Sequence, residues 1–189
     1  MAINYPTSLD TFTDPTASSL LTSPSHSGLH TDINSAVEAL EYKVNIGNTQ
    51  LGTYTTYTPT YSNITIGNAT VTAKYCQTND FVHVTGSIVL GSTTVIGTNP
   101  AISMGFNLDS LYYSPTTWVA EIGTATFYDT SAALHWFGIV QAANNSTLMQ
   151  IFSQAANTTY VQRGAVTATI PFTWATGDEI KWNVYFKKA

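Results

Sequence analysis

The sequence predicts a mainly β protein in which an extended N-terminal arm and a short coiled-coil helix precede an antiparallel, jelly-roll-like β-sandwich. Three observations favour this order. A helical pattern is confined to residues 23–47. The region 53–189 then contains about eight short segments with alternating apolar and polar residues, which is typical of a sandwich. Residues 1–22 are polar and contain prolines, which indicates an extended segment.

Residues 23–47 are predicted to form a helical neck. Ser23 can cap the helix, Pro24 suits its first position, and Gly47 is a common stop signal. Apolar residues recur at steps of four, three and four, as in a coiled-coil seam: Ile33, Val37, Leu40 and Val44. The pattern also fits an ordinary amphipathic helix packed on its own domain. Val and Leu at the seam are compatible with both dimers and trimers.

Two histidines, His26 and His30, extend the seam toward the N-terminus. Histidines four residues apart on one helix face can share a metal ion. No carboxylate or cysteine is placed to complete a conventional site, so we interpret both as neutral polar residues near the end of the seam. We therefore expect no metal and no other cofactor.

The arm, residues 1–22, has too few apolar residues to build a core of its own. We expect it to dock on another protein through four of them: Leu9, Phe12, Leu20 and Leu21. A frayed tail is the alternative interpretation.

In the β region the clearest signal is a hairpin formed by Ala69–Gln77 and Phe81–Leu90. The final strand is expected to be central, because it alternates cleanly and places four apolar residues on one face: Ile180, Trp182, Val184 and Phe186. Further strands are expected at Thr53–Tyr61, Ala101–Phe106, Thr117–Tyr128, Ala133–Val140, Thr147–Phe152, Tyr160–Val161 and Val166–Ile170. A turn is expected at Gly97–Pro100.

The composition excludes several classes of partner. Charged residues make up only 9 %, while aromatic residues make up 12 % and hydrophobic residues 43 %, so the chain can bury a core. With a net charge of −5 and no basic patch, nucleic acid is not an expected partner. No apolar run approaches the ~18–20 residues that span a bilayer, so we expect no membrane insertion. The polar surface must consist mainly of uncharged side chains, as on many extracellular and virion proteins.

Few residues suggest catalysis. Glu121 and Asp129 could form a glycosidase pair, but nothing in their spacing requires it. His83 and His135 lie within predicted strands and are expected to be hydrogen-bonded sheet residues. We therefore expect no enzymatic activity. Binding is more plausible, because tyrosines offer flat amphipathic faces to sugars or proteins. The best candidate patch is Tyr112 with Tyr113, in the loop before a proline.

Two stretches of the chain resemble structural proteins of tailed bacteriophages. The helical run SPSHSGLHTDINSAVEALEYKVNIG and the preceding INYPTSLDTFTDPT resemble the neck and anchoring arm of such proteins over residues 3–47. A looser similarity covers 54–90, where TYTPTYSNITIGNATVTAKYCQ resembles the start of their β heads.

The resemblance implies a homotrimer on the virion surface. The arm would bind a tail, baseplate or major capsid protein, the neck would join three copies, and the head would bind a host-surface glycan or protein. The alternative is a capsid decoration or head-fibre protein without a specific receptor. A glycan-cleaving enzyme is a more remote alternative.

Overall fold

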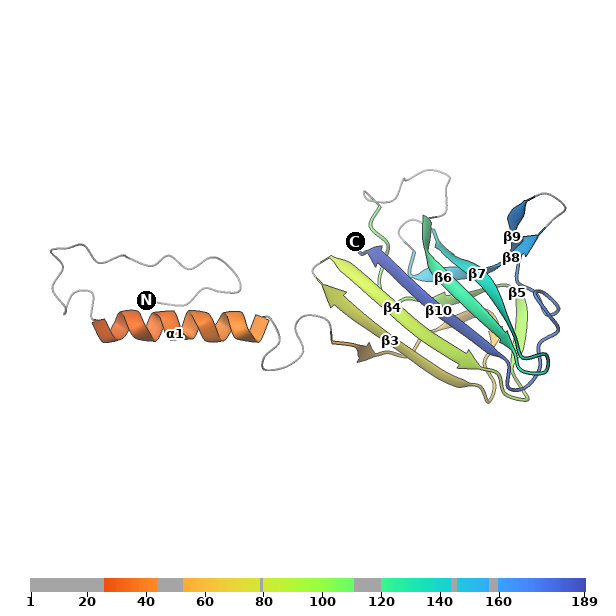
Figure 1. Ribbon diagram of the computed structural model, residues 1–189, viewed down its shortest axis with the longest axis horizontal. Helices are drawn as coiled ribbons and strands as arrows, with labels where there is room; N and C mark the ends of the chain where they lie inside the picture. Colours follow the sequence, from red (N-terminus) through yellow and green to blue (C-terminus); the bar gives the residue numbers. More distant parts are fainter. Residues whose placement is uncertain (1–25, 44–52, 79, 111–119, 144–145, 157–159) are drawn as a thin grey trace. The chain divides into compact units, whose positions relative to one another are not determined.

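The protein is mainly β, with one helix followed by ten strands (Figure 1). The computed structural model describes residues 26–43 and 53–189, apart from 79, 111–119, 144–145 and 157–159. The chain divides into two units, Met1–Thr53 and Tyr54–Ala189, which are described separately here.

In the first unit, helix α1 spans His26–Lys43. It confirms the predicted helix over its described part, while 23–25 and 44–47 lie outside the described residues. The three described seam residues are about half exposed in the single chain: Ile33 (52 %), Val37 (47 %) and Leu40 (53 %). The fourth, Val44, and the arm residues Leu9, Phe12, Leu20 and Leu21 lie outside the described residues.

The second unit contains all ten strands. They are β1 (Thr55–Thr56), β2 (Tyr61–Thr65), β3 (Thr70–Thr78), β4 (Phe81–Val89), β5 (Val95–Ser103), β6 (Ala120–Asp129), β7 (Leu134–Ala142), β8 (Leu148–Ala156), β9 (Val161–Ala165) and β10 (Glu179–Lys187).

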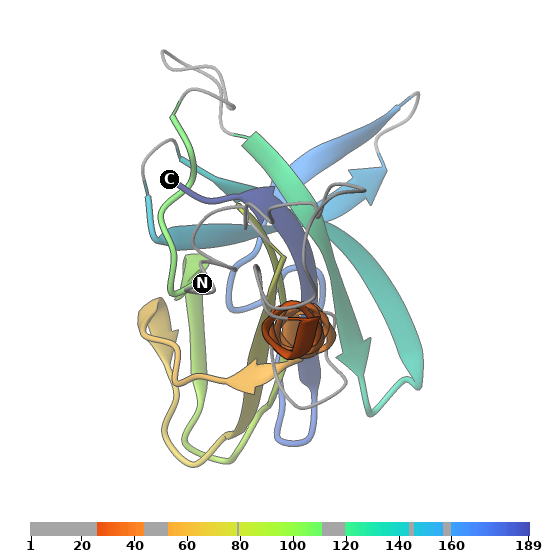
Figure 2. The same cartoon turned by 90° about the vertical axis from the view of Figure 1, so that its left-hand side faces the viewer.

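The strands form one antiparallel sheet rather than the expected pair of sheets. Their order is β1-β3-β4-β10-β6-β7-β8-β5-β2, and β9 pairs with β8. The sheet is continuous because β7 hydrogen-bonds to β6 on one side and to β8 on the other. It curls strongly, as Figures 1 and 2 show from two sides, and so buries one face in the way that a half-barrel does.

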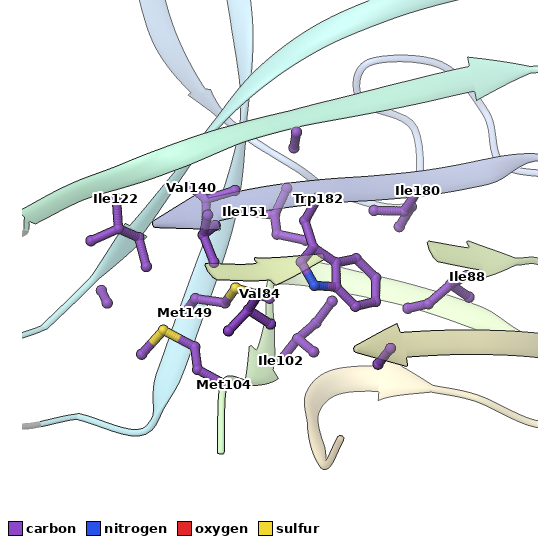
Figure 3. Packing of buried hydrophobic residues seen from close by; sticks show 14 of the residues in the cluster. Val84, Ile88, Ile102, Met104, Ile122, Val140, Met149, Ile151, Ile180 and Trp182 are labelled. Atoms are coloured by element: carbon purple, nitrogen blue, oxygen red, sulfur yellow. The ribbon is translucent and has the colours of Figure 1, made fainter. Parts of the chain in front are cut away.

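The core lies between the two halves of this curled sheet. It combines residues of β4 and β10 with residues of β5 and β8, among them Val84, Ile102 and Ile151. Figure 3 shows the Trp182 ring at its centre, with Val84, Ile88 and Ile102 around it. Apolar burial from strands far apart in sequence therefore holds the curl closed.

The last strand, β10, is central as predicted, with β4 and β6 as its neighbours. Its four inward residues, Ile180, Trp182, Val184 and Phe186, are at most 1 % exposed. The predicted hairpin is also confirmed: β3 pairs with β4 from Thr70↔Val89 to Thr78↔Phe81.

The expected turn at 97–100 is wrong, because these residues belong to β5. Asn99 has a φ of 53° and Asn63, on the paired strand β2, has a φ of 58°. The β2–β5 register shifts between Ser62 and Ile64, and Asn63 Nδ2 donates to the carbonyl of Thr98 at 2.9 Å. Asparagine tolerates left-handed backbone, so turn-forming residues here build a β-bulge rather than a chain reversal.

Two further strand expectations need correction. The segment expected as the strand Val166–Ile170 contains only the isolated pair Thr167↔Ile170, while the strand expected at 160–161 is β9, Val161–Ala165. Val166 is fully buried as a single core residue, which explains why its surroundings looked strand-like in the sequence. The expected strand Thr53–Tyr61 is shortened to β1, and Tyr61 instead begins β2.

Gly86 on β4 provides the first testable prediction. A Cβ added there would lie 2.3 Å from Cζ2 of Trp182 and 2.5 Å from the carbonyl oxygen of Thr72. Neither the buried ring nor the paired strand can move freely. We therefore expect Gly86→Ala to lower the free energy of unfolding by about 1–3 kcal/mol, measured by denaturant unfolding.

The matched control is Gly164→Ala, a second strand glycine whose added Cβ would come no closer than 3.1 Å to any other atom, the nearest being Ser153 Oγ. This change should alter stability by less than about 1 kcal/mol. Equal effects of the two substitutions would contradict the role assigned to the contact between Gly86 and Trp182.

Candidate binding surface

The outer face of β3, β4, β10 and β6 carries short polar side chains opposite the core. Strand register aligns them in two rows across the four strands. The first row is Thr72, Ser87, Lys181 and Thr126, and the second is Lys74, Thr85, Asn183 and Thr124. Residues distant in sequence thus become direct neighbours on one surface.

Together with Ala73, Gly86 and Trp182 beneath them, these eight residues line a hollow of about 500 Å³, called the hollow below. Five of the eight side chains in the two rows are short and carry a hydroxyl. Thr72 and Ser87 share a hydrogen bond between their hydroxyls at 2.8 Å, and the Thr85 hydroxyl donates to the carbonyl of Trp182 at 3.2 Å. The floor is therefore ordered and rich in groups that can both donate and accept.

The charged groups at the hollow are two lysines. Lys181 forms an ion pair with Glu179, which lies two residues earlier on the same face of β10. Lys74 makes no hydrogen bond or ion pair within the described part of the chain. No carboxylate is among the residues that line the hollow, so its local charge is positive although the whole chain is acidic.

An aromatic group borders the second row. Tyr185 follows Asn183 by two residues on β10, is 57 % exposed, and stacks on Phe81 with ring centroids 5.3 Å apart. His83, on β4, is hydrogen-bonded to both the Tyr54 hydroxyl and Asn183 Oδ1. Because an amide oxygen can only accept, Nε2 of His83 donates to Asn183, and Nδ1 faces the Tyr54 hydroxyl. These bonds confirm His83 as a hydrogen-bonded sheet residue.

The binding and metal-site candidates predicted from the sequence do not line the hollow within the described residues. Tyr112 and Tyr113 lie outside the described residues. His30 is exposed on α1, and the side chain of His26 is not described. Within the described ranges, no group of three or more His, Cys, Asp or Glu residues could hold a metal ion.

The hollow itself was missed, although the sequence contained a signal for it. Thr70-x-Thr72-x-Lys74 on the first strand of the hairpin and Thr85-x-Ser87 on the second are polar alternations that pairing places side by side. That signal covers only half of the hollow. The other half comes from β6 and β10, whose position beside the hairpin is not encoded locally.

The carboxylate pair considered for glycosidase chemistry does not assemble. Glu121 and Asp129 lie near opposite ends of β6. At ~3.3 Å of rise per residue, eight steps separate them by roughly 26 Å. Glycosidase carboxylates lie roughly 5–9.5 Å apart, so these two cannot act together.

Two other acids have structural roles. Asp178 is 1 % exposed, and its carboxylate accepts from the backbone N–H of Thr130 at 2.9 Å and of Ala175 at 2.6 Å. Asp109 is largely buried and pairs with Lys187. These contacts connect turns and loops to the sheet.

No protein-family model matches this chain, and neither a curated protein nor a solved structure shows significant similarity to it. Among the described residues, no helix is long and apolar enough to cross a membrane.

Asp129 caps the turn between β6 and β7. Its Oδ1 accepts from the Ser131 hydroxyl at 2.7 Å and from the backbone N–H of Ser131 and Ala132 at 2.9 and 3.1 Å. The Ser131 hydroxyl, followed by the Ala132 N–H, lowers the pKa of this carboxyl below its ordinary value of 3.8. The charged form is thus preferred in the folded state.

A lowered native pKa makes this contribution to stability depend on pH. It is fully present above the ordinary pKa and is lost as the pH falls through the native value.

We expect Asp129→Ala to be less stable than wild type at neutral pH, and the difference in their stability to narrow as the pH falls. Thermal unfolding across the acidic range measures it. The control is Asp129→Asn, which keeps a hydrogen-bond acceptor without the charge, so its stability relative to Asp129→Ala should not depend on pH. A stability difference between wild type and Asp129→Ala that stays constant with pH would contradict the role given to the Asp129 carboxylate.

Proposed function

We propose that this chain is a non-enzymatic fibre protein of a tailed-bacteriophage virion, whose helix joins three copies and whose β head binds a host surface. The observation that carries the proposal is the seam of α1. Three apolar residues at coiled-coil spacing are about half exposed in the single chain: Ile33, Val37 and Leu40.

An exposed apolar seam on a short helix is stabilised when another helix buries it. Helix α1 has 18 residues, and most helical stability in proteins comes from packing an apolar face rather than from helix propensity. Copies of the same helix offer a matching seam. The copy number of three comes from the resemblance of residues 3–47 to phage necks, since Val and Leu at the seam also permit a dimer.

The curled sheet of the β domain suits the role of a head. Its outer face presents hydroxyls, two lysines and an exposed tyrosine around the hollow. Such groups form weak, reversible contacts with polar surfaces. Several identical heads on one neck would multiply weak contacts into useful avidity without new chemistry.

The arm, residues 1–22, is proposed to fix the protein to the particle through its apolar residues. Attachment to the tail or baseplate favours host recognition. Attachment over the capsid shell is the alternative, in which the same layout serves a decoration or head-fibre protein.

The first test concerns the seam. Leu40→Asp would place three carboxylates together in an apolar interface, where burying an ion costs on the order of several kcal/mol. We expect the variant to dissociate to monomers in native mass spectrometry or sedimentation. Ser35→Asp is the control, because it adds the same charge two residues after Ile33, away from the seam, and should leave the oligomer intact. An unchanged mass for Leu40→Asp would refute the coiled-coil proposal.

The second test concerns the arm. Deleting residues 1–22 should leave a folded oligomer that no longer joins the particle. Antibody-labelled electron microscopy of purified particles measures incorporation and position together. Label at the tail end in wild type supports the proposal, whereas label over the capsid supports the decoration alternative. Normal incorporation of the shortened protein would show that the anchor lies elsewhere.

A further inference from the structure

We infer that the hollow binds an acidic saccharide, with sugar hydroxyls on its Thr and Ser floor and the acidic group at Lys74. The inference rests on the proposed host-binding role of the β head and names the ligand class. The hollow combines ordered hydroxyls with a lysine that has no partner in the described part of the chain, and an exposed aromatic ring borders it.

The size and floor of the hollow fit a short saccharide. Its volume of about 500 Å³ lies within the roughly 300–1,000 Å³ of small-molecule sites. Five hydroxyls line it: Thr72, Thr85, Ser87, Thr124 and Thr126. Each can donate and accept, which matches the vicinal hydroxyls of a sugar ring. The floor belongs to four paired strands, so binding would require little ordering.

The charges favour an acidic ligand over a neutral one. Lys74 has no ion pair or hydrogen bond in the described part of the chain, so its ammonium is available to a carboxylate or phosphate. Lys181 is held by Glu179, which leaves this pair suited to hydrogen-bonding sugar hydroxyls. Because no carboxylate lines the hollow, an anion would meet attraction there despite the acidic chain.

The border of the hollow adds a platform for a sugar ring. Tyr185 is exposed and its ring is fixed by stacking on Phe81. Asn183, beside it, is oriented by its bond from His83 and lines the hollow. A protein partner is less well matched, because no exposed large apolar side chain lines the hollow to anchor a protein interface; its one aromatic lining residue, Trp182, is buried.

The experiment is calorimetric titration of the full chain with three sets of oligosaccharides of equal length. Oligogalacturonate carries carboxylates, an oligomer of glycerol phosphate substituted with sugar carries phosphates, and a galactan is neutral. We expect one of the acidic sets to bind at least about tenfold more tightly than the neutral set, and its affinity to fall as salt is raised. Whichever acidic set binds identifies the acidic group.

Variants locate the site. Lys74→Gln should reduce affinity for the acidic oligomer by about tenfold or more. Thr126→Trp should abolish binding by filling the hollow without changing any charge. The control is Lys188→Gln, which also removes one positive charge. The Nζ of Lys188 lies 5.8 Å from the centroid of the Phe106 ring, outside the hollow, so this variant should bind like wild type. All three change side chains outside the buried core, and their melting temperatures verify folding.

Equal affinity for acidic and neutral oligomers, or unchanged binding by both Lys74→Gln and Thr126→Trp, would overturn the inference. Absence of binding to any acidic oligomer would do the same. In each of these cases, if the wild-type protein still binds to host cells in a labelling assay, the proposed host-binding function is retained. Loss of both cell labelling and particle incorporation would instead remove the proposed function.

Discussion

The contact between Trp182 and Gly86 is the packing constraint on which the β domain depends. The indole ring of the central strand lies directly on the backbone of β4, where a side chain on residue 86 would collide with it. Only a glycine permits this approach, and the ring then fills the space between the two halves of the curled sheet (Figure 3). The position of β10 between β4 and β6 follows the same constraint, because its inward residues supply the centre of the core.

The strict alternation that buries Trp182 also shapes the opposite face. With apolar residues directed inward from β3, β4, β10 and β6, the intervening residues meet solvent, and five of the eight in the two rows of the hollow are short and hydroxylated. A core of large side chains and an outer face of small ones thus arise from the same strands. The hollow is the direct result, and its polarity follows from a chain that uses Thr, Ser and Asn where most proteins use charges.

Three of the acids in the β domain have structural partners. Asp178 and Asp129 satisfy backbone N–H groups at turns, and Asp109 pairs with Lys187. The acids of the β domain are therefore largely committed to structure, and Glu121 and Asp129 are too far apart to cooperate. Lys74 differs from these groups because the described chain gives it no partner. That contrast supports the binding role proposed for the outer face.

The sequence by itself determined the local elements: the helix, the β3–β4 hairpin and the inward face of β10. These depend on periodicity and turn chemistry between near neighbours. Tertiary structure alone decided the single curled sheet, the bulge at Asn63 and Asn99, and the hollow. Alternation reveals that a strand has two faces but not which strand lies beside it, so Thr72 and Thr126 become neighbours only through β4 and β10. Strand pairing depends on burial summed over the whole core, which no local pattern records.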